Sequence, residues 1–316
     1  MDHGVAHLSQ KCDAKLTHSL RRSQTPKVSV VVLNWCGEEE TRACLYSVLQ
    51  SEYPAFNVVL VDNGSPDGSG ERLQCDYPNL DFIQIEENCG YTGGNNRGIQ
   101  FAIDRGDDYV LVLNNDTEID RLCIKFLVEA ATERDDVGGV TSKILYHHVP
   151  ARIWYGGGHF SPLHGLGIHW SEGESDVRSG THVPEEVSFM SGCCLLLSCR
   201  AMREVGGFVD ELFAYVEDAE LCLRLSRSGY RMLYQPNARV LHHSRPTGEP
   251  PTPFQIRQRD RNRRWVMRRY FGPRYLIPFF ARFYASRLIL VVRYLAVGDW
   301  GRARAIVQGS FGGIGP

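Results

Sequence analysis

Three apolar, β-branched runs, each followed at once by polar residues, constrain the fold of this chain most strongly. The runs are KVSVVVLNW from Lys27, FNVVLVDNGSPDGSG from Phe56 and YVLVLNNDTEID from Tyr109. Continuous runs of this kind are typical of strands buried on both faces of a parallel sheet. Segments with helical character separate them, as in EEETRACLYSVLQS. This alternation predicts an α/β fold with a mostly parallel, twisted sheet flanked by helices.

Polar side chains gather where these strands end. Asn34, Asp62, Asn88 and Asp116 all fall at or just after the end of a predicted strand. In open sheets of this class the ligand lies outside the carboxyl ends of the strands. We therefore expect the four side chains to face one crevice. We expect Glu118 and Asp120 to begin the next helix.

The second half of the chain contains one further helix with an unusual carboxylate. From Val137 to Ser188 the pattern has no clear period, and irregular strands and loops that cover the crevice are expected; FMSGCCLLLSC then predicts a buried strand. A helix is expected from Glu217 to Ser228, and Asp218 falls in its apolar stripe, whereas Glu220 and Arg224 form an i,i+4 pair on the outer face. The remaining members of the stripe are Leu221, Cys222 and Leu225.

A buried carboxylate is costly unless it has a use. Asp218 could simply stabilise the helix N-terminus, where negative charge is favourable. The functional alternative is a general base held in a cleft.

Two common nucleotide-binding motifs are absent from the sequence. No G-x-G-x-x-G follows the first strand, and G-x-x-x-x-G-K-[ST] occurs nowhere. The ten cysteines contain no Cys-x-x-Cys pair, and most lie in apolar runs, so reduced, buried thiols and a cytoplasmic location are expected. Residues 1–26 lack the continuous apolar core of a signal peptide and are expected to form a flexible arm.

Six motifs in a fixed order resemble a known family. They are VSVVVLNW, VLVDNGSPDGS, ENCGYTGGNNRG, YVLVLNNDTEID, VGGFVDELFAYVEDAELCLR and PNARVLHH, and they extend from Lys27 to Ser244. In this order they resemble the family 2 glycosyltransferases of the GT-A fold, and within them the rhamnosyltransferase-like branch. The resemblance covers about two thirds of the chain.

The resemblance implies a site for a nucleotide-diphosphate sugar. Asp62 and Asn34 would hold the base and ribose, since a carboxylate accepts hydrogen bonds from a ring N–H or a hydroxyl. The glycines of ENCGYTGGNN would let the backbone approach the nucleotide closely. The full set of implied substrate contacts is Asn34, Asp62, Asn88, Gly90, Asn95, Asn114, Trp154 and Gly192.

The resemblance also implies a cation and a base. Asn114-Asn115-Asp116 stands where the family has its Asp-x-Asp motif, so Asp116 would hold Mg²⁺ or Mn²⁺ against the donor diphosphate. His242 would complete the metal site, and His243 is the adjacent competitor. Asp218 would deprotonate an acceptor hydroxyl, and Glu217 would bind the acceptor. The implied activity is inverting sugar transfer to a glycan or a lipid-linked acceptor, as in cell-surface polysaccharide assembly.

Two other classes of function stay open at this point. A sugar-phosphate nucleotidyltransferase would use a similar sheet, but it would have a glycine-rich, Arg- or Lys-bearing loop after the first strand, and NWCGEEE is not such a loop. A non-catalytic sugar-nucleotide-binding module would tolerate the loss of Asp218.

A basic segment ends the chain. Residues 254–297 hold eleven Arg and one Asp, a net charge of +10 within a chain of net charge -2. The run LIPFFARFYASRLILVVRYLAV is long enough to span a bilayer, but each arginine at a helix centre costs roughly 2.5 to 3.5 kcal/mol. We therefore expect an interfacial helix in peripheral membrane contact, or a helix packed on the catalytic domain or on a second subunit, as in a homodimer.

These features predict three parts of the chain. Residues 1–26 form the arm, 27–248 a GT-A catalytic domain and 249–316 a basic helical extension. The expected location is the cytoplasm, at the inner face of the cell membrane, and no nucleic-acid partner is expected.

Overall fold

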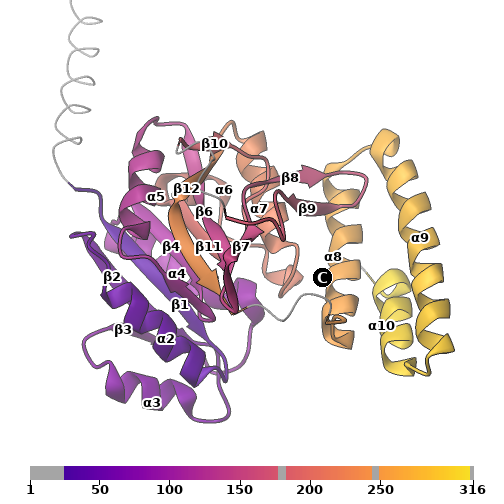
Figure 1. The fold of residues 1–316 in the computed structure, drawn as a ribbon, viewed down its shortest axis with the longest axis horizontal. Coiled ribbons are helices and arrows are strands. Elements are labelled where there is room, and N and C mark those ends of the chain that lie inside the picture. The colour runs from indigo at the N-terminus through magenta and orange to yellow at the C-terminus, as the bar shows by residue number, and fades with distance from the viewer. Residues whose placement is uncertain (1–24, 177–182, 244–248, 314–316) are drawn as a thin grey trace, which may run out of the picture.

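The computed structural model describes residues 25–176, 183–243 and 249–313. A central mixed sheet has the strand order β10–β12–β6–β11–β4–β1–β2–β3, with β5 added to β12 and β7 added to β6 (Figure 1). The strands of this sheet are β1 (Val28–Asn34), β2 (Phe56–Asp62), β3 (Asp81–Gln84), β4 (Tyr109–Asn114), β5 (Thr117–Ile119), β6 (Val137–Tyr146), β7 (Val149–Tyr155), β10 (Glu185–Glu186), β11 (Cys194–Ser198) and β12 (Arg231–His242). A separate hairpin pairs β8 (Gly158–Ser161) with β9 (Leu166–His169).

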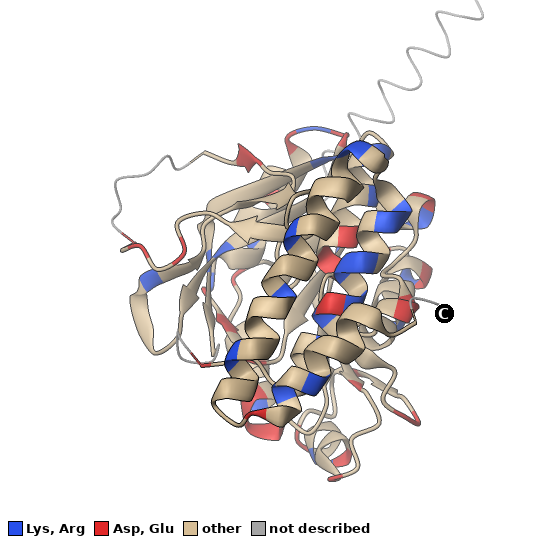
Figure 2. Cartoon of the chain, turned by 90° about the vertical axis from the view of Figure 1, so that its right-hand side faces the viewer, with Lys and Arg blue, Asp and Glu red and all other residues tan. Residues whose placement is uncertain are grey.

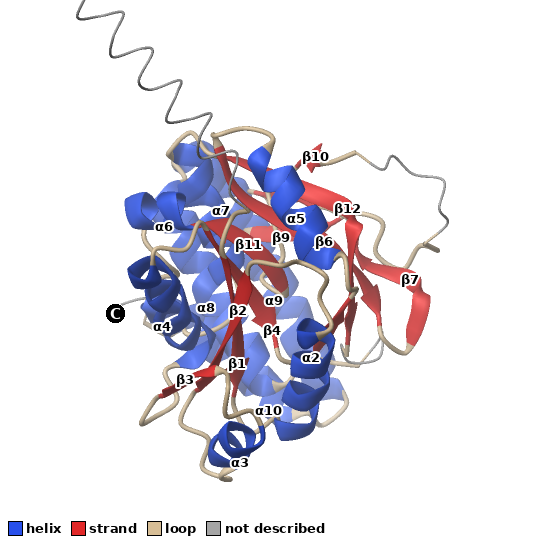
Figure 3. Ribbon diagram, turned by 90° about the vertical axis from the view of Figure 1, so that its left-hand side faces the viewer, coloured by secondary structure: helices blue, strands red, loops and turns tan. Residues whose placement is uncertain are grey.

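Helices cover both faces of the sheet (Figure 3). Those of the sheet-bearing part are α2 (Glu38–Leu49), α3 (Ser69–Asp76), α4 (Gly90–Arg105), α5 (Cys123–Thr132), α6 (Cys199–Val205), the 3₁₀ turn η1 (Asp210–Leu212) and α7 (Glu217–Arg227). Three further helices follow: α8 (Pro253–Tyr270), α9 (Pro273–Ala296) and α10 (Trp300–Phe311). The predicted α/β class with a helical C-terminal extension is confirmed.

The three β-branched runs form the parallel centre of the sheet. β1 pairs in parallel with β2 and with β4, in registers that set Asn34 opposite Asp62 and Leu33 opposite Asn114. All three polar strand ends therefore meet at one edge. β11 is antiparallel to β4 and sets Cys194 opposite Leu113. The turn before β11 consequently reaches the same edge as the end of β4.

Glycines let α4 lie directly on β1. A Cβ atom at Gly98 would stand 2.3 Å from Val31 Cγ1, and one at Gly94 would stand 2.4 Å from Leu33 Cδ1. Such distances are not tolerated in a packed core. The GYTGGNN segment thus brings the helix close to the strand and fixes where the first turn of α4 meets the sheet edge.

The segment expected to hold irregular strands and loops contains β6 to β10, and the pairing of the ten-residue strand β6 with β12 and with β7 has register shifts. One expectation about the middle of the chain is wrong. Glu118 does not begin a helix: it lies in β5, which pairs with the end of β12, and the next helix starts at Cys123. Tertiary pairing outweighs the local preference there.

The C-terminal helices share the hydrophobic core of the sheet-bearing part. Val266 and Met267 of α8 and Phe279 and Phe283 of α9 are buried in that core. The outer face of α9 is different, because it carries exposed apolar side chains such as Leu288 and Val292. Figure 2 shows basic positions at intervals along the C-terminal helices. Among the described residues, α9 is the helix whose length and composition would allow it to cross a membrane.

Candidate active site

A cleft of about 640 Å³ opens at the edge where the parallel strands end. It is lined by Leu33, Trp35, Asn63, Asn88, Gly90, Tyr91, Leu113, Asn114, Asn115, Asp116, Phe213, Ala214, Tyr215 and Phe254. Four of the predicted site residues are in this list: Asn88, Gly90, Asn114 and Asp116. A volume of several hundred Å³ is typical of small-ligand sites.

Asp116 and His242 form one polar pair of the cleft. His242 Nε2 lies 3.4 Å from Asp116 Oδ2. Backbone pairing brings them together: β12 runs antiparallel to β5 with His242 opposite Thr117, and the His243 N–H donates to the Asp116 carbonyl oxygen at 2.8 Å. Burial opposes the ionisation of Asp116, but the neighbouring His242 outweighs it, so the pKa of Asp116 lies below its ordinary value.

Three buried polar atoms around this pair have no protein partner among the described residues. They are Asp116 Oδ1, Asn114 Oδ1 and His242 Nδ1. Unpaired buried acceptors are rare in folded proteins and point to an absent ion, water or ligand. Two oxygen donors beside an imidazole suit Mg²⁺ or Mn²⁺. The residues present therefore fit a divalent cation.

A second group of possible metal ligands lies next to this pair. Glu118 Oε1 lies 3.0 Å from His243 Nε2 and 3.2 Å from His147 Nε2, and the two imidazole rings are stacked. These three residues are partly or largely exposed, and the Glu118 carboxylate already pairs with both imidazole rings. His242, in contrast, is buried beside an unpaired carboxylate oxygen. The geometry thus favours His242 over His243 as the partner of Asp116.

The carboxylate of Asp218 lies beside the cleft-lining residue Tyr91. Asp218 Oδ2 accepts a 3.1 Å hydrogen bond from the Gly192 N–H, and Oδ1 accepts one of 2.7 Å from the Ala219 N–H. The Tyr91 hydroxyl group donates to the Gly192 carbonyl oxygen at 2.7 Å. These bonds orient Asp218 and leave one lone pair on each of its oxygens free.

Burial perturbs the ionisation of Asp218 and its neighbours. It raises the pKa of Asp218, although the two backbone N–H groups oppose the shift. Burial also raises the pKa of Glu217 well above its ordinary value, with the adjacent Asp218 adding to the effect, and Glu217 Oε2 has no partner among the described residues. Two adjacent carboxyl groups with raised pKa values beside a cleft are typical of acid–base sites.

The loop before α7 has a rare backbone conformation. Phe213, Tyr215 and Val216 have φ values of 61°, 69° and 74°. Residues other than glycine seldom have a positive φ, and for β-branched valine a positive φ is a clear outlier. The loop lines the cleft and leads directly into Glu217 and Asp218.

The sequence and fold resemble those of proteins with assigned names. Residues 26–268 match the model described as Glycosyltransferase like family 2. The chain belongs to the family 2 glycosyltransferases. This confirms the family expected from the six motifs.

Two curated relatives of this glycosyltransferase are named as a rhamnosyltransferase and a hexosyltransferase. It is 34% identical over 227 residues to the N-acetylglucosaminyl-diphospho-decaprenol L-rhamnosyltransferase of Mycobacterium tuberculosis, covering 64% of this chain and 71% of the relative. It is 27% identical over 214 residues to the low-salt glycan biosynthesis hexosyltransferase Agl10 of Haloferax volcanii, covering 67% of this chain and 65% of the relative.

Two solved structures share the fold. One is the mannosyltransferase PcManGT from Pyrobaculum calidifontis in complex with GDP-Man and Mn²⁺, with a TM-score of 0.55, 15% identity, and coverage of 91% of this chain and 86% of that one. The other is GalNAc-T7 with UDP, GalNAc and Mn²⁺, with a TM-score of 0.58, 19% identity, and coverage of 72% and 45%. The GT-A fold is confirmed.

Asn34 and Asp62 lie below the cleft of the glycosyltransferase rather than on its wall. Both are buried, and the Asn34 amide donates to Asp62 Oδ1 at 2.7 Å. Asp62 also accepts hydrogen bonds from Ser65 and Gln84, which lower its pKa against the effect of burial. This network ties the ends of β1 and β2 to the loop after β2. The predicted contact of Asn34 and Asp62 with the donor stays a prediction.

The remaining predicted donor contacts differ in their placement. Asn88 Oδ1 accepts hydrogen bonds from the Gly90 N–H and from Asn63, and so shapes the start of α4. Asn95 is buried one turn later, where its amide donates to the Tyr91 carbonyl oxygen, and its Oδ1 has no partner among the described residues. Trp154 is outside the list of cleft-lining residues and packs edge-on against His242, with ring centroids 4.7 Å apart.

Glu220 differs from its expected position. The i,i+4 pair with Arg224 exists, but Glu220 is fully buried rather than on an outer, solvated face. Its carboxylate also accepts a hydrogen bond from the hydroxyl group of Tyr270 at the end of α8. The error arises because the C-terminal helices cover the side of α7 that would otherwise face solvent.

Ten of the fourteen cleft-lining residues were not among the predicted site residues. Nine of these ten lie within the quoted motifs: Leu33, Trp35, Asn63, Tyr91, Leu113, Asn115, Phe213, Ala214 and Tyr215. Phe254 had no such signal, since it lies in the first turn of α8, in the basic segment. The wall of the cleft is therefore built almost entirely from the motifs, and Phe254 is added from the C-terminal extension.

Proposed function

We propose that this glycosyltransferase moves a sugar from a nucleotide-diphosphate donor to an acceptor hydroxyl group with inversion at the anomeric carbon. The observation that carries the proposal is the placement of Asp116 in the cleft and of Asp218 beside the cleft-lining Tyr91, with the pKa of Asp218 raised and that of Asp116 lowered. Two carboxyl groups whose environments separate their pKa values suit different tasks in one reaction. The relatives named above, which are glycosyltransferases by name, support the same reaction class.

Asp218 acts as the general base in this mechanism. One carboxylate oxygen of Asp218 removes the proton of the acceptor hydroxyl group while the acceptor oxygen forms a bond to the anomeric carbon. The bond from the anomeric carbon to the diphosphate breaks at the same time, and the nucleoside diphosphate leaves. Attack on the face opposite the leaving group inverts the anomeric centre, and no covalent enzyme intermediate is required.

Asp116 and His242, with Asn114, would hold Mg²⁺ or Mn²⁺. The fit is supported by the unpaired buried oxygens and ring nitrogen of these residues. The cation, when bound, neutralises the negative charge that develops on the departing diphosphate. Two solved GT-A structures were obtained with Mn²⁺. Glu217 is proposed to position the acceptor, because its unpaired oxygen can accept a hydrogen bond from a hydroxyl group.

The acceptor is proposed to be lipid-linked and to be reached from a membrane surface, at the inner face of the cell membrane. The name of the mycobacterial relative specifies a decaprenol diphosphate acceptor. On α9, the exposed residues Ile277, Leu288, Val292 and Leu295 fall on one stripe at helical spacing. At helical spacing the exposed Arg282 and Arg293 fall together on one side of this stripe. An exposed apolar stripe with arginines on one side suits an interfacial helix on anionic lipid.

Family membership decides against a nucleotidyltransferase, but a binding module without catalysis needs a direct test. The test is Asp218→Asn, with a panel of nucleotide sugars with and without Mn²⁺. We expect the variant to keep the increase in thermal stability caused by donor binding and to lose turnover by about 10²- to 10⁴-fold. NMR of the product should show the anomeric configuration opposite to that of the donor. Unchanged turnover in Asp218→Asn, or retention of configuration, would refute the mechanism.

A further inference from the structure

The strained loop between η1 and α7 is held by a residue from the C-terminal extension. Asn262 of α8 is fully buried. Its Nδ2 atom lies 2.8 Å from the Leu212 carbonyl oxygen, 2.9 Å from that of Ala214 and 2.8 Å from that of Tyr215. The two N–H groups of one side-chain amide are therefore shared among three carbonyl oxygens of the loop, of which that of Leu212 also accepts from the Ala214 N–H at 2.7 Å.

The orientation of the Asn262 amide is fixed by a second contact. Arg261 Nη1 donates to Asn262 Oδ1 at 3.2 Å, so the oxygen end points away from the loop and the N–H₂ end points at it. Arg261 Nη1 also donates to the Glu211 carbonyl oxygen at 2.9 Å. The same turn of α8 thus binds the backbone on both sides of Leu212.

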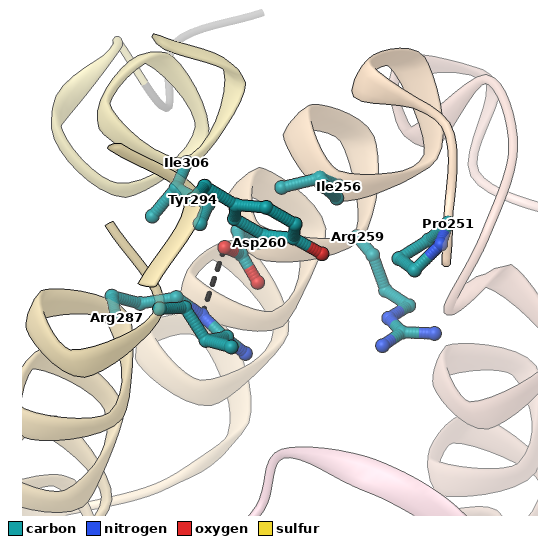
Figure 4. A pocket seen from close by; sticks show the side chains of 8 residues that line it. Pro251, Ile256, Arg259, Asp260, Arg287, Tyr294 and Ile306 are labelled. Carbon is teal, nitrogen blue, oxygen red and sulfur yellow. Dashed lines mark ion pairs between the residues drawn. The ribbon is translucent and has the colours of Figure 1, made fainter. Parts of the chain in front are cut away.

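The opposite sides of α8 are tied to other parts of the molecule. Asp260 forms a buried ion pair with Arg287 of α9 at 2.9 Å, beside a small pocket of about 50 Å³ between the C-terminal helices (Figure 4). Arg263 donates to the His164 carbonyl oxygen at 2.9 and 2.6 Å, and Arg264 donates to that of Gly309 at 2.9 Å. Because α8 is held on several sides, it gives Asn262 a fixed position.

The conformation that Asn262 supports is costly without it. Residues other than glycine with positive φ are strained and persist only where the surroundings enforce them. Further support for this loop comes from Thr92 of α4, whose N–H donates to the Phe213 carbonyl oxygen at 3.1 Å, and from Gln258 of α8, whose Nε2 lies 3.4 Å from the Leu212 carbonyl oxygen. The loop leads directly to Glu217 and Asp218.

We propose that Asn262 is a positioning residue for the transfer reaction. By holding the carbonyl groups of Leu212, Ala214 and Tyr215, it keeps the loop in the conformation that aims Asp218 into the cleft. The C-terminal extension is then part of the catalytic machinery rather than an appendage. This inference rests on the role of Asp218 proposed above.

The test compares Asn262→Ala and Asn262→Leu with Arg264→Met. The first two variants remove the donor, one leaving a cavity and the other preserving volume. The third removes another buried donor of α8 that does not touch the loop. We expect both Asn262 variants to lose about 10- to 100-fold in kcat with a smaller change in the KM of the donor, because displacement of a reacting group by about 1 Å has an effect of this size. Arg264→Met should lower Tm but leave kcat within about 3-fold.

A pH profile separates positioning from a general loss of stability. Burial raises the pKa of Asp218. If the loop is released, Asp218 becomes more solvated, and the acidic limb of the kcat profile should move to lower pH in the Asn262 variants but not in Arg264→Met. Equal losses of kcat in all three variants, or an unmoved acidic limb, would overturn the proposal. If Asp218→Asn itself keeps full turnover, the proposed function fails instead, which is a separate result.

Discussion

Tyr91 and Gly192, a hundred residues apart in the chain, are joined by a 2.7 Å hydrogen bond from the phenol hydroxyl group to the backbone carbonyl oxygen. The N–H of the same glycine donates to Asp218. Tyr91 therefore stabilises the peptide that orients the proposed base. A Cβ atom at Gly192 would lie 3.1 Å from the Tyr91 hydroxyl oxygen and 3.5 Å from Asp218 Cβ, so the contact depends on a residue without a side chain.

Tyr91→Phe should impair catalysis more than stability. The substitution removes a single hydrogen bond, which typically contributes about 1 kcal/mol, and keeps the ring that packs against Phe208. We expect a loss of roughly 3- to 10-fold in kcat and a fall in Tm of a few degrees at most. Steady-state kinetics and thermal unfolding check both parts. A variant with unchanged kcat would show that the Gly192 peptide needs no support from Tyr91.

Glu217→Gln should stabilise the protein above mildly acidic pH. Burial raises the pKa of Glu217 in the folded protein, so the protonated carboxyl group favours the folded state. This contribution to stability is complete below the pKa of an unfolded glutamate, about 4.3, and is lost as the pH rises through the higher folded value. Glutamine cannot ionise and avoids this loss. We expect Tm at pH 7 to 8 to rise by about 2–4 °C for each kcal/mol regained.

Thermal unfolding from pH 5 to pH 8 measures this effect. The exposed Glu71→Gln serves as the control, and it should follow the wild-type protein at every pH. If the Tm of Glu217→Gln stays parallel to that of the wild-type protein across the whole range, the buried carboxyl group is not the cause.

Asp116→Asn and His242→Ala should both weaken binding of the cation. The first keeps a side-chain oxygen but removes the charge, and the second removes the imidazole that lies 3.4 Å from it. We expect the Mn²⁺ concentration for half-maximal activity to rise by about tenfold or more. Calorimetric titration of Mn²⁺ in the presence of the nucleoside diphosphate gives a readout that does not depend on turnover. His243→Ala is the comparison, and a larger effect there than in His242→Ala would contradict the assignment.

Charges placed on the outer face of α9 should abolish contact with lipid. Leu288 and Val292 are 66% and 58% exposed, so Leu288→Glu combined with Val292→Glu can be made without disturbing the core. We expect the double variant to lose flotation with anionic vesicles and to keep its Tm within a few degrees. Tyr46→Glu, at a residue of α2 that is 68% exposed, is the matched control.

The outer face of α9 could instead bind a second copy of the chain. In that case the wild-type protein would form a dimer in solution that the double variant converts to a monomer, while flotation would be weak in both. Light scattering after size exclusion distinguishes this outcome from membrane contact.

The centre of the fold could be predicted from the sequence because its signals are local. Each β-branched run became a buried strand, and the polar residues after them reached one edge because parallel strands end on the same side. Asn114 and Asp116 lie in the cleft for this reason. His242 lies beside Asp116 because β5 pairs with β12. The sequence did not indicate this pairing, since Glu118 was expected to start a helix.

The supports of the proposed base could not be predicted, because they depend on tertiary contacts. Phe, Tyr and Val have no local preference for positive φ, so the conformation of the 213–216 loop is imposed from outside. Asn262 lies in a basic helix whose sequence shows only an arginine-rich pattern. Glu220 was expected to face solvent because nothing within α7 indicates that Tyr270 covers it.

The position of Phe279 and Phe283 in the main core has a consequence for biosynthesis. Both follow the last strand of the sheet, β12, by about forty residues, and they are almost fully buried against the sheet-bearing part. A ribosome makes the chain from its N-terminus at roughly 5–20 residues per second, so the strands exist for seconds before these rings do. During that interval the nascent chain carries an apolar surface that only the later helix α9 covers.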